Sequence, residues 1–259
     1  MNSKNDLIAK RLYELPKRRF LLISPILLIL FIYMVYDIRQ NDFKLGLGSA
    51  IAAMIYFLVG FWLIRKNNEC ELKITVLLYE DIDIDTYESY YEFSKKHNRN
   101  AYYLNFGISH FFKGKFQKSN EYFRKIDISR LQFYKRKHFL QNYYFYYFIL
   151  CLHTFDMEKA TTIKTSFKEL VDKNNKEESW NKIYERMQKI EQVLLGSGTN
   201  FIPRTSSYKL IMLQDYYYLA LNEINLGNPE KAKELFQTIA TENPELFYVR
   251  EAKQYLEEN

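Results

Sequence analysis

The apolar positions of the chain follow two different patterns. Near the N-terminus they form two uninterrupted runs, residues 20–36 and 45–64, of seventeen and twenty residues without a charged side chain. As helices these runs are about 26 and 30 Å long, enough to cross the hydrocarbon core of a bilayer. A signal peptide would show a small-residue cleavage site after the first run, but a second apolar run follows instead. The pattern predicts a hairpin of two transmembrane helices.

Beyond residue 64 the apolar positions recur with helical spacing, and polar residues separate them. Only 8 Gly and 5 Pro occur in the chain, so turns are scarce and an all-β fold is disfavoured. The pattern predicts an all-α protein with long helices and short connections.

Basic residues flank the two runs unequally. Six Lys or Arg precede the first run and Arg65, Lys66 and Lys73 follow the second, whereas the loop 37–44 carries Arg39 and Lys44. By the positive-inside rule both termini face the cytoplasm, and the chain is a two-span protein of the cell membrane. Residues 65–259 hold 29 Lys or Arg against 27 Asp or Glu, so they lack the basic patch that a nucleic-acid partner requires.

Small residues mark one stripe of the second run, at Gly46, Ala50 and Ala53. Small side chains let transmembrane helices approach closely. We expect this stripe to pack on the first helix of the same chain or to form the seam of a dimer.

Residues 100–127 contain two amphipathic runs around a turn at Gly114, and residues 216–244 repeat that arrangement around Gly227. Small residues at matching offsets let two antiparallel helices approach, and large ones fill the space between them. These predicted positions are Tyr103, Phe106, Gly107, Gly114, Ser119 and Phe123 in the first copy, and Tyr216, Leu219, Ala220, Gly227, Ala232, Phe236 and Pro244 in the second.

Helix ends can be assigned around the second copy. Asn228 followed by Pro229 predicts an N-cap and a first helical residue, and Pro244 predicts the start of a final helix over residues 245–258. In this register Ala232 faces the partner helix at close range, and Lys233 faces water.

These offsets resemble the tetratricopeptide repeat. The resemblance implies a membrane anchor over residues 1–66, a connecting helical segment over 67–99 and an α-solenoid of helical hairpins over 100–259. It also implies a concave surface that binds a peptide or a protein. In some relatives a Lys/Asn clamp holds a carboxylate, but the matching positions here are Leu104 and Ile108, so that ligand is not expected.

Between the two copies the repeat is less regular, because the turn glycines lie 113 residues apart instead of the roughly 102 of three ideal repeats. Residues 130–171 predict a hairpin with a buried first helix, a turn near residues 155–156 and Ala160 as its small contact residue. A further helix over 177–195 and a long loop over 196–204 follow.

Sites for chemistry are few. Residues 81–92 place carboxylates as in a calcium loop, but Thr86 stands where such a loop needs Gly. The alternative is a capping box, with Asp85 as N-cap and Glu88 three residues later, that opens a helix over 86–96; whether the segment binds an ion stays open.

The four His residues never occur at i, i+4 spacing, and the sequence has no HExxH motif, nucleophile elbow or phosphate-binding loop. Cys70 and Cys151 are too few for a disulfide framework. We expect no catalytic, cofactor or metal site.

The expected function is that of a non-enzymatic scaffold, tethered to the bilayer, that binds an unidentified protein or peptide at the cytoplasmic face. The alternative is an auxiliary subunit that docks on a membrane transport or secretion complex through its transmembrane hairpin.

Overall fold

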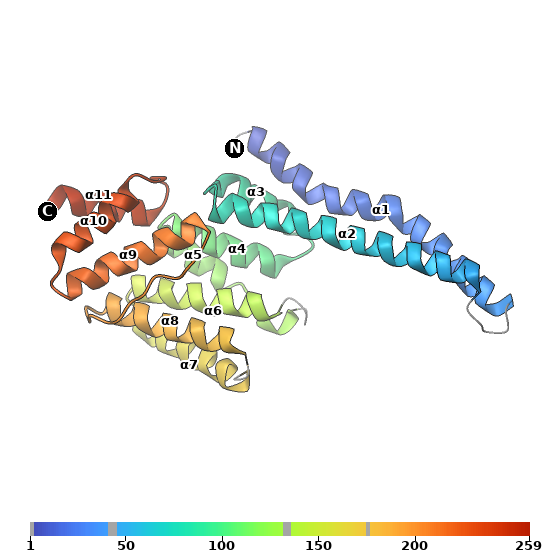
Figure 1. The fold of residues 1–259 in the computed structure, drawn as a ribbon. Helices are drawn as coiled ribbons and strands as arrows, with labels where there is room; N and C mark the ends of the chain where they lie inside the picture. The colour runs from blue at the N-terminus through green and yellow to red at the C-terminus, as the bar shows by residue number, and fades with distance from the viewer. Residues whose placement is uncertain (1–2, 41–45, 132–135, 175–176) are drawn as a thin grey trace. The chain divides into compact units, whose positions relative to one another are not determined.

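The computed structural model describes residues 3–40, 46–131, 136–174 and 177–259, and throughout them the regular secondary structure is helical, without a strand (Figure 1). The expectation of an all-α protein is therefore confirmed. The helices are α1 (Ser3–Gln40), α2 (Leu47–Tyr79), α3 (Ile84–Ser94), α4 (Arg99–Phe112), α5 (Phe116–Phe123), α6 (Arg136–His153), α7 (Met157–Lys173), α8 (Glu178–Leu194), α9 (Lys209–Asn225), α10 (Pro229–Ala240) and α11 (Phe247–Glu258), with a 3-10 turn at Ile128–Arg130.

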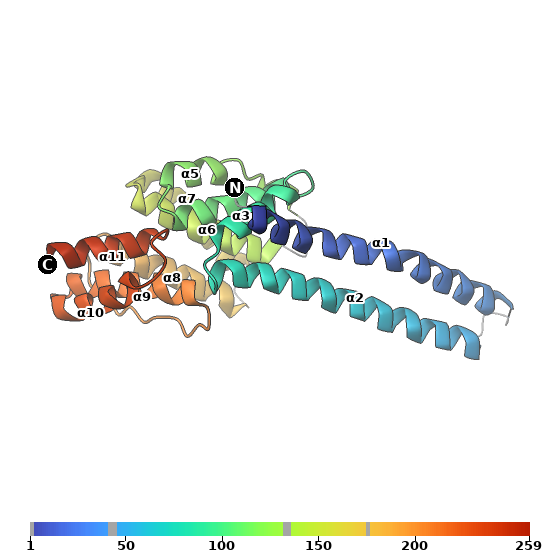
Figure 2. The same cartoon turned by 90° about the horizontal axis from the view of Figure 1, so that it is seen from above.

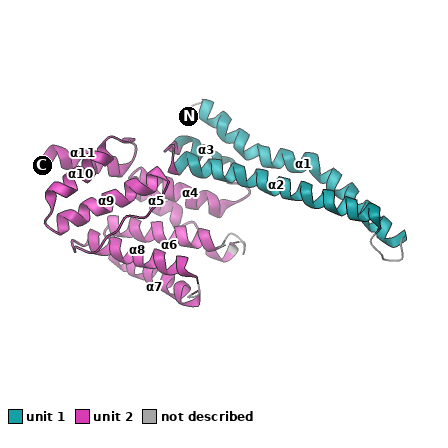
Figure 3. Ribbon diagram, viewed as in Figure 1, with its two compact units in different colours: residues 1–78, 85–93 teal, residues 79–84, 94–259 magenta. Residues whose placement is uncertain are grey.

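The chain divides into two compact units (Figure 3). Unit 1 comprises residues 1–78 and 85–93, and unit 2 comprises residues 79–84 and 94–259. The helix α2 passes through residue 66, the expected end of the anchor, without a break and ends at Tyr79.

In unit 1 the helices α1 and α2 run antiparallel, as Figure 2 shows from above. Hydrogen bonds tie both ends of their apolar parts: Arg19 Nη1 donates to the Lys66 carbonyl at 3.0 Å, and Ser49 N donates to Asp37 Oδ2 at 3.0 Å. Both helices are long and apolar enough to cross a membrane. Lys44 and Leu45, which belong to the predicted loop and second span, lie outside the described residues.

The face of α2 that is buried differs from the expected stripe. Gly46, Ala50 and Ala53 are only half-buried. The buried residues are Ser49 and Ala52, each one position earlier than Ala50 and Ala53 and therefore on a different side of the helix. Side chains of α1 contact this part of α2. A Cβ on Gly48 would lie 2.5 Å from the Tyr33 hydroxyl, so a larger residue there would displace the end of the tyrosine side chain.

The helix α3 packs on α1 within unit 1. Ser89 Oγ donates to Asp6 Oδ1 at 2.9 Å, and the Tyr13 ring stacks on Phe93 with centroids 6.1 Å apart. The predicted capping box is wrong, because α3 begins at Ile84 and places Asp85 in its first turn. The buried Ile82, at φ +52°, turns the chain there, so burial of Ile82 and Ile84 sets the start of the helix.

Helical hairpins build unit 2. The pairs α4/α5, α6/α7 and α9/α10 are antiparallel neighbours; α8 packs on α6, α7 and α9, and α11 packs on α9 and α10. The first hairpin closes on Gly107: Ser119 Oγ donates to its carbonyl at 2.7 Å, and a Cβ at this position would lie 3.0 Å from the Phe123 ring. This close approach is the contact that the small residues predicted.

Two predicted turns are confirmed. Asn228 is the N-cap of α10, with Pro229 as its first residue. Phe155, at φ +56°, and the N-cap Asp156 separate α6 from α7, where Ala160 is buried. Residues 132–135 of the predicted hairpin lie outside the described residues.

Other boundaries shift. The last helix begins at Phe247 instead of residue 245, because the Asn243 side chain accepts a hydrogen bond from Glu245 N at 2.9 Å and holds a turn there. In α6 the buried stretch is residues 145–152, and Asn142 is exposed. The helix α8 lies within one residue of the predicted range 177–195, but the loop after it covers residues 195–208 and so extends four residues beyond the predicted 196–204.

Candidate functional site

Aromatic rings from four helices fill the interior of unit 2. We call the set Phe111, Phe112, Tyr146, His153, Tyr218, Phe247 and Tyr248, from α4, α6, α9 and α11, the central aromatic cluster. Ring centroids lie 5.4 Å apart for Phe111 and Phe247, 5.5 Å for Phe112 and Tyr146, and 6.1 Å for Tyr218 and Tyr248.

This cluster joins the first hairpin to the last helix. Arg250 Nη2 donates to the Lys113 carbonyl at 2.9 Å, and a Cβ on Gly114 would lie 2.8 Å from Phe247 Cβ. Glycine suits position 114 for two reasons: the turn needs a positive φ, here +67°, and Phe247 leaves no space for a Cβ. In a simple solenoid each repeat contacts only its neighbours. Here the first hairpin, α4/α5, also contacts the last helix, α11, so side chains of unit 2 itself fill the space between them.

Hydrogen bonds run through the cluster. His153 Nε2 and the Tyr218 hydroxyl lie 3.0 Å apart, and Gln214 Nε2 donates to the Tyr248 hydroxyl at 2.9 Å. Burial lowers the pKa of His153 to about 4 and raises the pKa of Tyr218 and Tyr248 well above the usual value. All three side chains are therefore neutral at pH 7, and the cluster is a hydrogen-bonded core.

Beside the cluster lie three charged residues, Arg186, Arg204 and Asp215, which we call the ionic triad. Asp215 is fully buried and forms ion pairs with both arginines. Arg204 contacts it through its backbone N–H, at 2.6 Å from Oδ2, and through Nη2, at 2.7 Å from Oδ1. Burial lowers the pKa of Arg186 to about 10 although Asp215 opposes that shift, so Arg186 stays charged at pH 7.

The triad holds the long loop 195–208 against α8 and α9. Arg186 Nη1 donates to the Ile202 carbonyl at 2.8 Å, and its guanidinium lies 3.9 Å from the centroid of the Phe201 ring. Arg204, itself in the loop, also donates from Nη2 to Gln214 Oε1 at 3.0 Å. These bonds order the loop, which makes the triad a structural clamp.

Unit 2 also holds residues 79–84, the stretch between α2 and α3. The Tyr79 ring lies 5.9 Å from Tyr208, and its hydroxyl hydrogen-bonds to Tyr146. Asn243 Nδ2 donates to the Ile82 carbonyl at 3.3 Å, and Lys209 N donates to Glu80 Oε2 at 3.2 Å. Residues of α9 and of the turn before α11 thus hold the connection between α2 and α3, through the Ile82 carbonyl and the Glu80 side chain.

The predicted repeat positions lie within the hairpins. Phe106, Gly107, Ser119 and Phe123 are buried between α4 and α5, with Tyr103 half-buried at their edge. In the second copy Ala220, Ala232 and Phe236 are buried, Tyr216 and Leu219 are half-buried, and Gly227, at φ +79°, and Pro244 are exposed in turns. The structure therefore brings the buried positions of each copy together as packing contacts, whereas Gly227 and Pro244 form turns. Leu104 and Ile108, where relatives carry a polar clamp, are buried.

The ionic triad was not predicted from the sequence. One signal was available: Gln214 and Asp215 interrupt the apolar run at residues 210–221, and a buried carboxylate needs a partner. The partners could not be read from spacing, because Arg186 lies on another helix and Arg204 in a loop.

The predicted ion loop at residues 81–92 is helical from Ile84 onward, so its carboxylates do not surround one point. Among the residues that the structure describes, no group of three or more His, Cys, Asp or Glu side chains could hold a metal ion.

Three exposed aliphatic side chains lie at the adjoining ends of α8 and α9. Leu195, Ile224 and Leu226, which we call the end patch, are 57%, 37% and 51% exposed. Asn225 Nδ2 donates to the Val193 carbonyl at 2.8 Å and joins the two helix ends. The end patch is therefore an apolar surface on a fixed support.

In comparisons with known proteins, no family model, curated protein or solved structure matches the chain.

Proposed function

We propose that the chain is a membrane-tethered scaffold whose unit 1 anchors in the bilayer and whose unit 2 binds a protein or peptide at the cytoplasmic face. The supporting observation is the apolar surface of the long helices. Leu21, Leu22 and Phe57 are 70%, 74% and 72% exposed, and similar side chains surround them along α1 and α2. A surface this apolar marks an interaction site in a folded protein, and lipid is the partner that suits helices of this length.

The resemblance of two hairpins to tetratricopeptide repeats supports a binding role for unit 2. Since its interior is filled by the central aromatic cluster, we place the partner on the outer surface, at the end patch. Three exposed aliphatic side chains on joined helix ends can anchor an apolar side chain of a partner, and anchors of this kind carry most of the binding energy in interfaces.

Affinity purification of the full chain in mild detergent tests this role. Leu195→Glu with Ile224→Glu places two charges on the end patch. The matched control, Gln117→Glu with Gln237→Glu, adds the same charges at exposed helical positions elsewhere. We expect a protein that accompanies the wild type and the control to be lost from the patch variant by about ten-fold or more, as for a contact worth at least 1.4 kcal/mol. Equal recovery in all three would exclude the end patch as the binding surface.

Topology gives a second test. Because Lys and Arg are concentrated before the first run and after the second, we expect both termini to face the cytoplasm. A reporter fused after Asn259 should be active only in its cytoplasmic form. A reporter active outside the cytoplasm would overturn the orientation and with it the compartment of the partner.

A second candidate function is that of an auxiliary subunit docked on a membrane complex through the hairpin. One observation favours it: a Cβ on Gly60 would have no neighbour within 4 Å, so α2 leaves a small recess that another helix can enter. In that case Gly60→Leu should release a co-purifying polytopic membrane protein, and the end-patch variant should retain it.

A further inference from the structure

The register of α1 against α2 collects positive charge at one level of unit 1. The bond from Arg19 Nη1 to the Lys66 carbonyl brings the start of the first apolar run beside the end of the second. Lys17 and Arg18, next to Arg19 on α1, therefore lie near Arg65, next to Lys66 on α2. Arg18 and Arg65 keep 72% of their side-chain surface exposed, although each forms a pair with a glutamate of its own helix.

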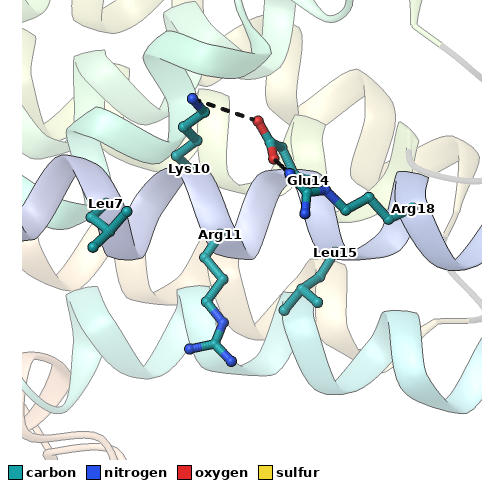
Figure 4. Close-up of a pocket in the computed structure, with 6 residues that line it drawn as sticks. All are labelled: Leu7, Lys10, Arg11, Glu14, Leu15 and Arg18. Carbon is teal, nitrogen blue, oxygen red and sulfur yellow. Dashed lines mark hydrogen bonds and ion pairs between the residues drawn. The ribbon is translucent and has the colours of Figure 1, made fainter.

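On the N-terminal side of Arg19, α1 carries a hollow of about 460 Å³ (Figure 4). Leu7, Lys10, Arg11, Glu14, Leu15 and Arg18 line it. Glu14 is shared between Lys10, at 4.0 Å, and Arg18, at 2.5 Å, whereas Arg11 forms no ion pair with the residues drawn. Three cations and one carboxylate leave the hollow with a net positive charge. Its lining also offers two aliphatic side chains.

The lining residues recur every three or four positions, so they form one stripe of α1. Four residues beyond Arg18 this stripe reaches Leu22, which is 74% exposed, and then Ile26 and Ile29, which are 53% and 66% exposed. One stripe thus changes from cationic to aliphatic where the apolar run begins. Leu15, midway between Arg11 and Arg18, lies about 7 Å along the helix from Phe20, within the depth of the headgroup layer.

We infer that this stripe is a binding site for an anionic phospholipid, with the phosphate between Arg11 and Arg18 and an acyl chain along Leu22 and Ile26. The inference rests on the proposed insertion of α1 in a bilayer. Charge complementarity selects an anionic headgroup, and the aliphatic continuation selects a lipid over a free phosphate. A basic residue next to a membrane span favours anionic lipid by up to about five-fold.

A tryptophan on the stripe can report the lipid beside it. Leu22→Trp in a Trp62→Phe background places an indole on the same stripe one helical turn after Arg18, in the apolar run. The remaining Trp180 is buried in unit 2. The full chain is reconstituted into vesicles of phosphatidylglycerol and phosphatidylcholine in equal amounts, with bromine on the acyl chains of one lipid or of the other. Bromine quenches an indole that it contacts, so the two samples compare the lipids at the site.

We expect brominated phosphatidylglycerol to quench the reporter with about five-fold preference over brominated phosphatidylcholine. Arg11→Gln with Arg18→Gln should reduce the preference to below about two-fold, since the remaining basic residues attract anionic lipid only generally. The charge-matched control, Arg99→Gln with Arg124→Gln at exposed positions of unit 2, should leave it unchanged. Inorganic phosphate or glycerol 3-phosphate should not displace the lipid.

Three results would overturn the inference. Quenching by both lipids with equal strength would mean insertion without an anionic site. Displacement by inorganic phosphate would mean a phosphate site without lipid specificity. An absence of quenching by either lipid would mean that α1 does not enter the bilayer, so the proposed anchor would fail together with the site.

Discussion

Asp215→Asn should lower the free energy of unfolding of unit 2 by about 3–5 kcal/mol, the cost of removing one partner from a buried ion pair. The substitution keeps the shape of the side chain and removes its charge. Arg186, only 8% exposed, and Arg204 would then face each other without a carboxylate between them. The cost comes from this uncompensated positive charge, because a neutral amide cannot offset the lost hydration of two guanidinium groups.

Denaturant titration of the full chain in detergent can measure this effect. In a Trp62→Phe background the emission reports Trp180, which lies on α8, the helix that carries Arg186. The control is Asp172→Asn, which breaks an exposed pair with Lys168 and should cost at most about 1 kcal/mol. If both variants unfolded at the same denaturant concentration, the triad would contribute no more than a surface pair and the clamp would be disproved.

Ala232→Trp should destabilise the last hairpin by about 3 kcal/mol or more, because overpacking a core typically costs 1–3 kcal/mol and an indole is far larger than a methyl group. Ala232 is fully buried on α10, between Asn228 at the helix start and the buried Phe236 one turn later. With no room for the ring, α10 must move away from α9, and this movement also disturbs the contact of Tyr217 with Phe236.

The control for this variant is chosen from the structure. The sequence register suggested Lys233 as a position that faces water, but Lys233 is half-buried and its Nζ donates to the Asn259 carbonyl at 3.1 Å. Lys231 is exposed on the other side of Ala232, so Lys231→Trp introduces the same side chain into solvent. Melts followed by circular dichroism should show a large loss of stability for position 232 and a shift within about 0.5 kcal/mol for position 231. Comparable losses would show that the assigned register of α10 is wrong.

Local chemistry explains why the hairpins could be predicted. Gly107 and Ser119 lie twelve residues apart, and antiparallel helices joined by a short turn bring residues at such a spacing face to face. Asn228 and Pro229 define a helix start through their own backbone preferences. Signals of this kind act within a turn or between two adjacent helices, so a single sequence contains them.

Boundaries that depend on distant contacts were misplaced. The start of α3 follows the burial of Ile82 and Ile84, and Ile82 is held by Asn243 from far along the chain. The buried face of α2 depends on its neighbour α1, whose Tyr33 hydroxyl would lie 2.5 Å from a Cβ on Gly48. In both cases the deciding partner is remote in sequence, and helical periodicity carries no information about it.

The sequence by itself determined the helical character of the protein, its two long apolar helices and the small-residue contacts inside its hairpins, because each depends on residues of one helix or of two helices that are adjacent in the chain. Only the tertiary structure decided that the first hairpin meets the last helix through Phe111 and Phe247, and that Asp215 pairs with Arg186 and Arg204. It also decided that Arg19 lies beside Lys66, and this contact brings the basic residues of α1 close to those of α2. These contacts join residues of separate helices and loops, and the packing of whole helices against one another fixes their partners.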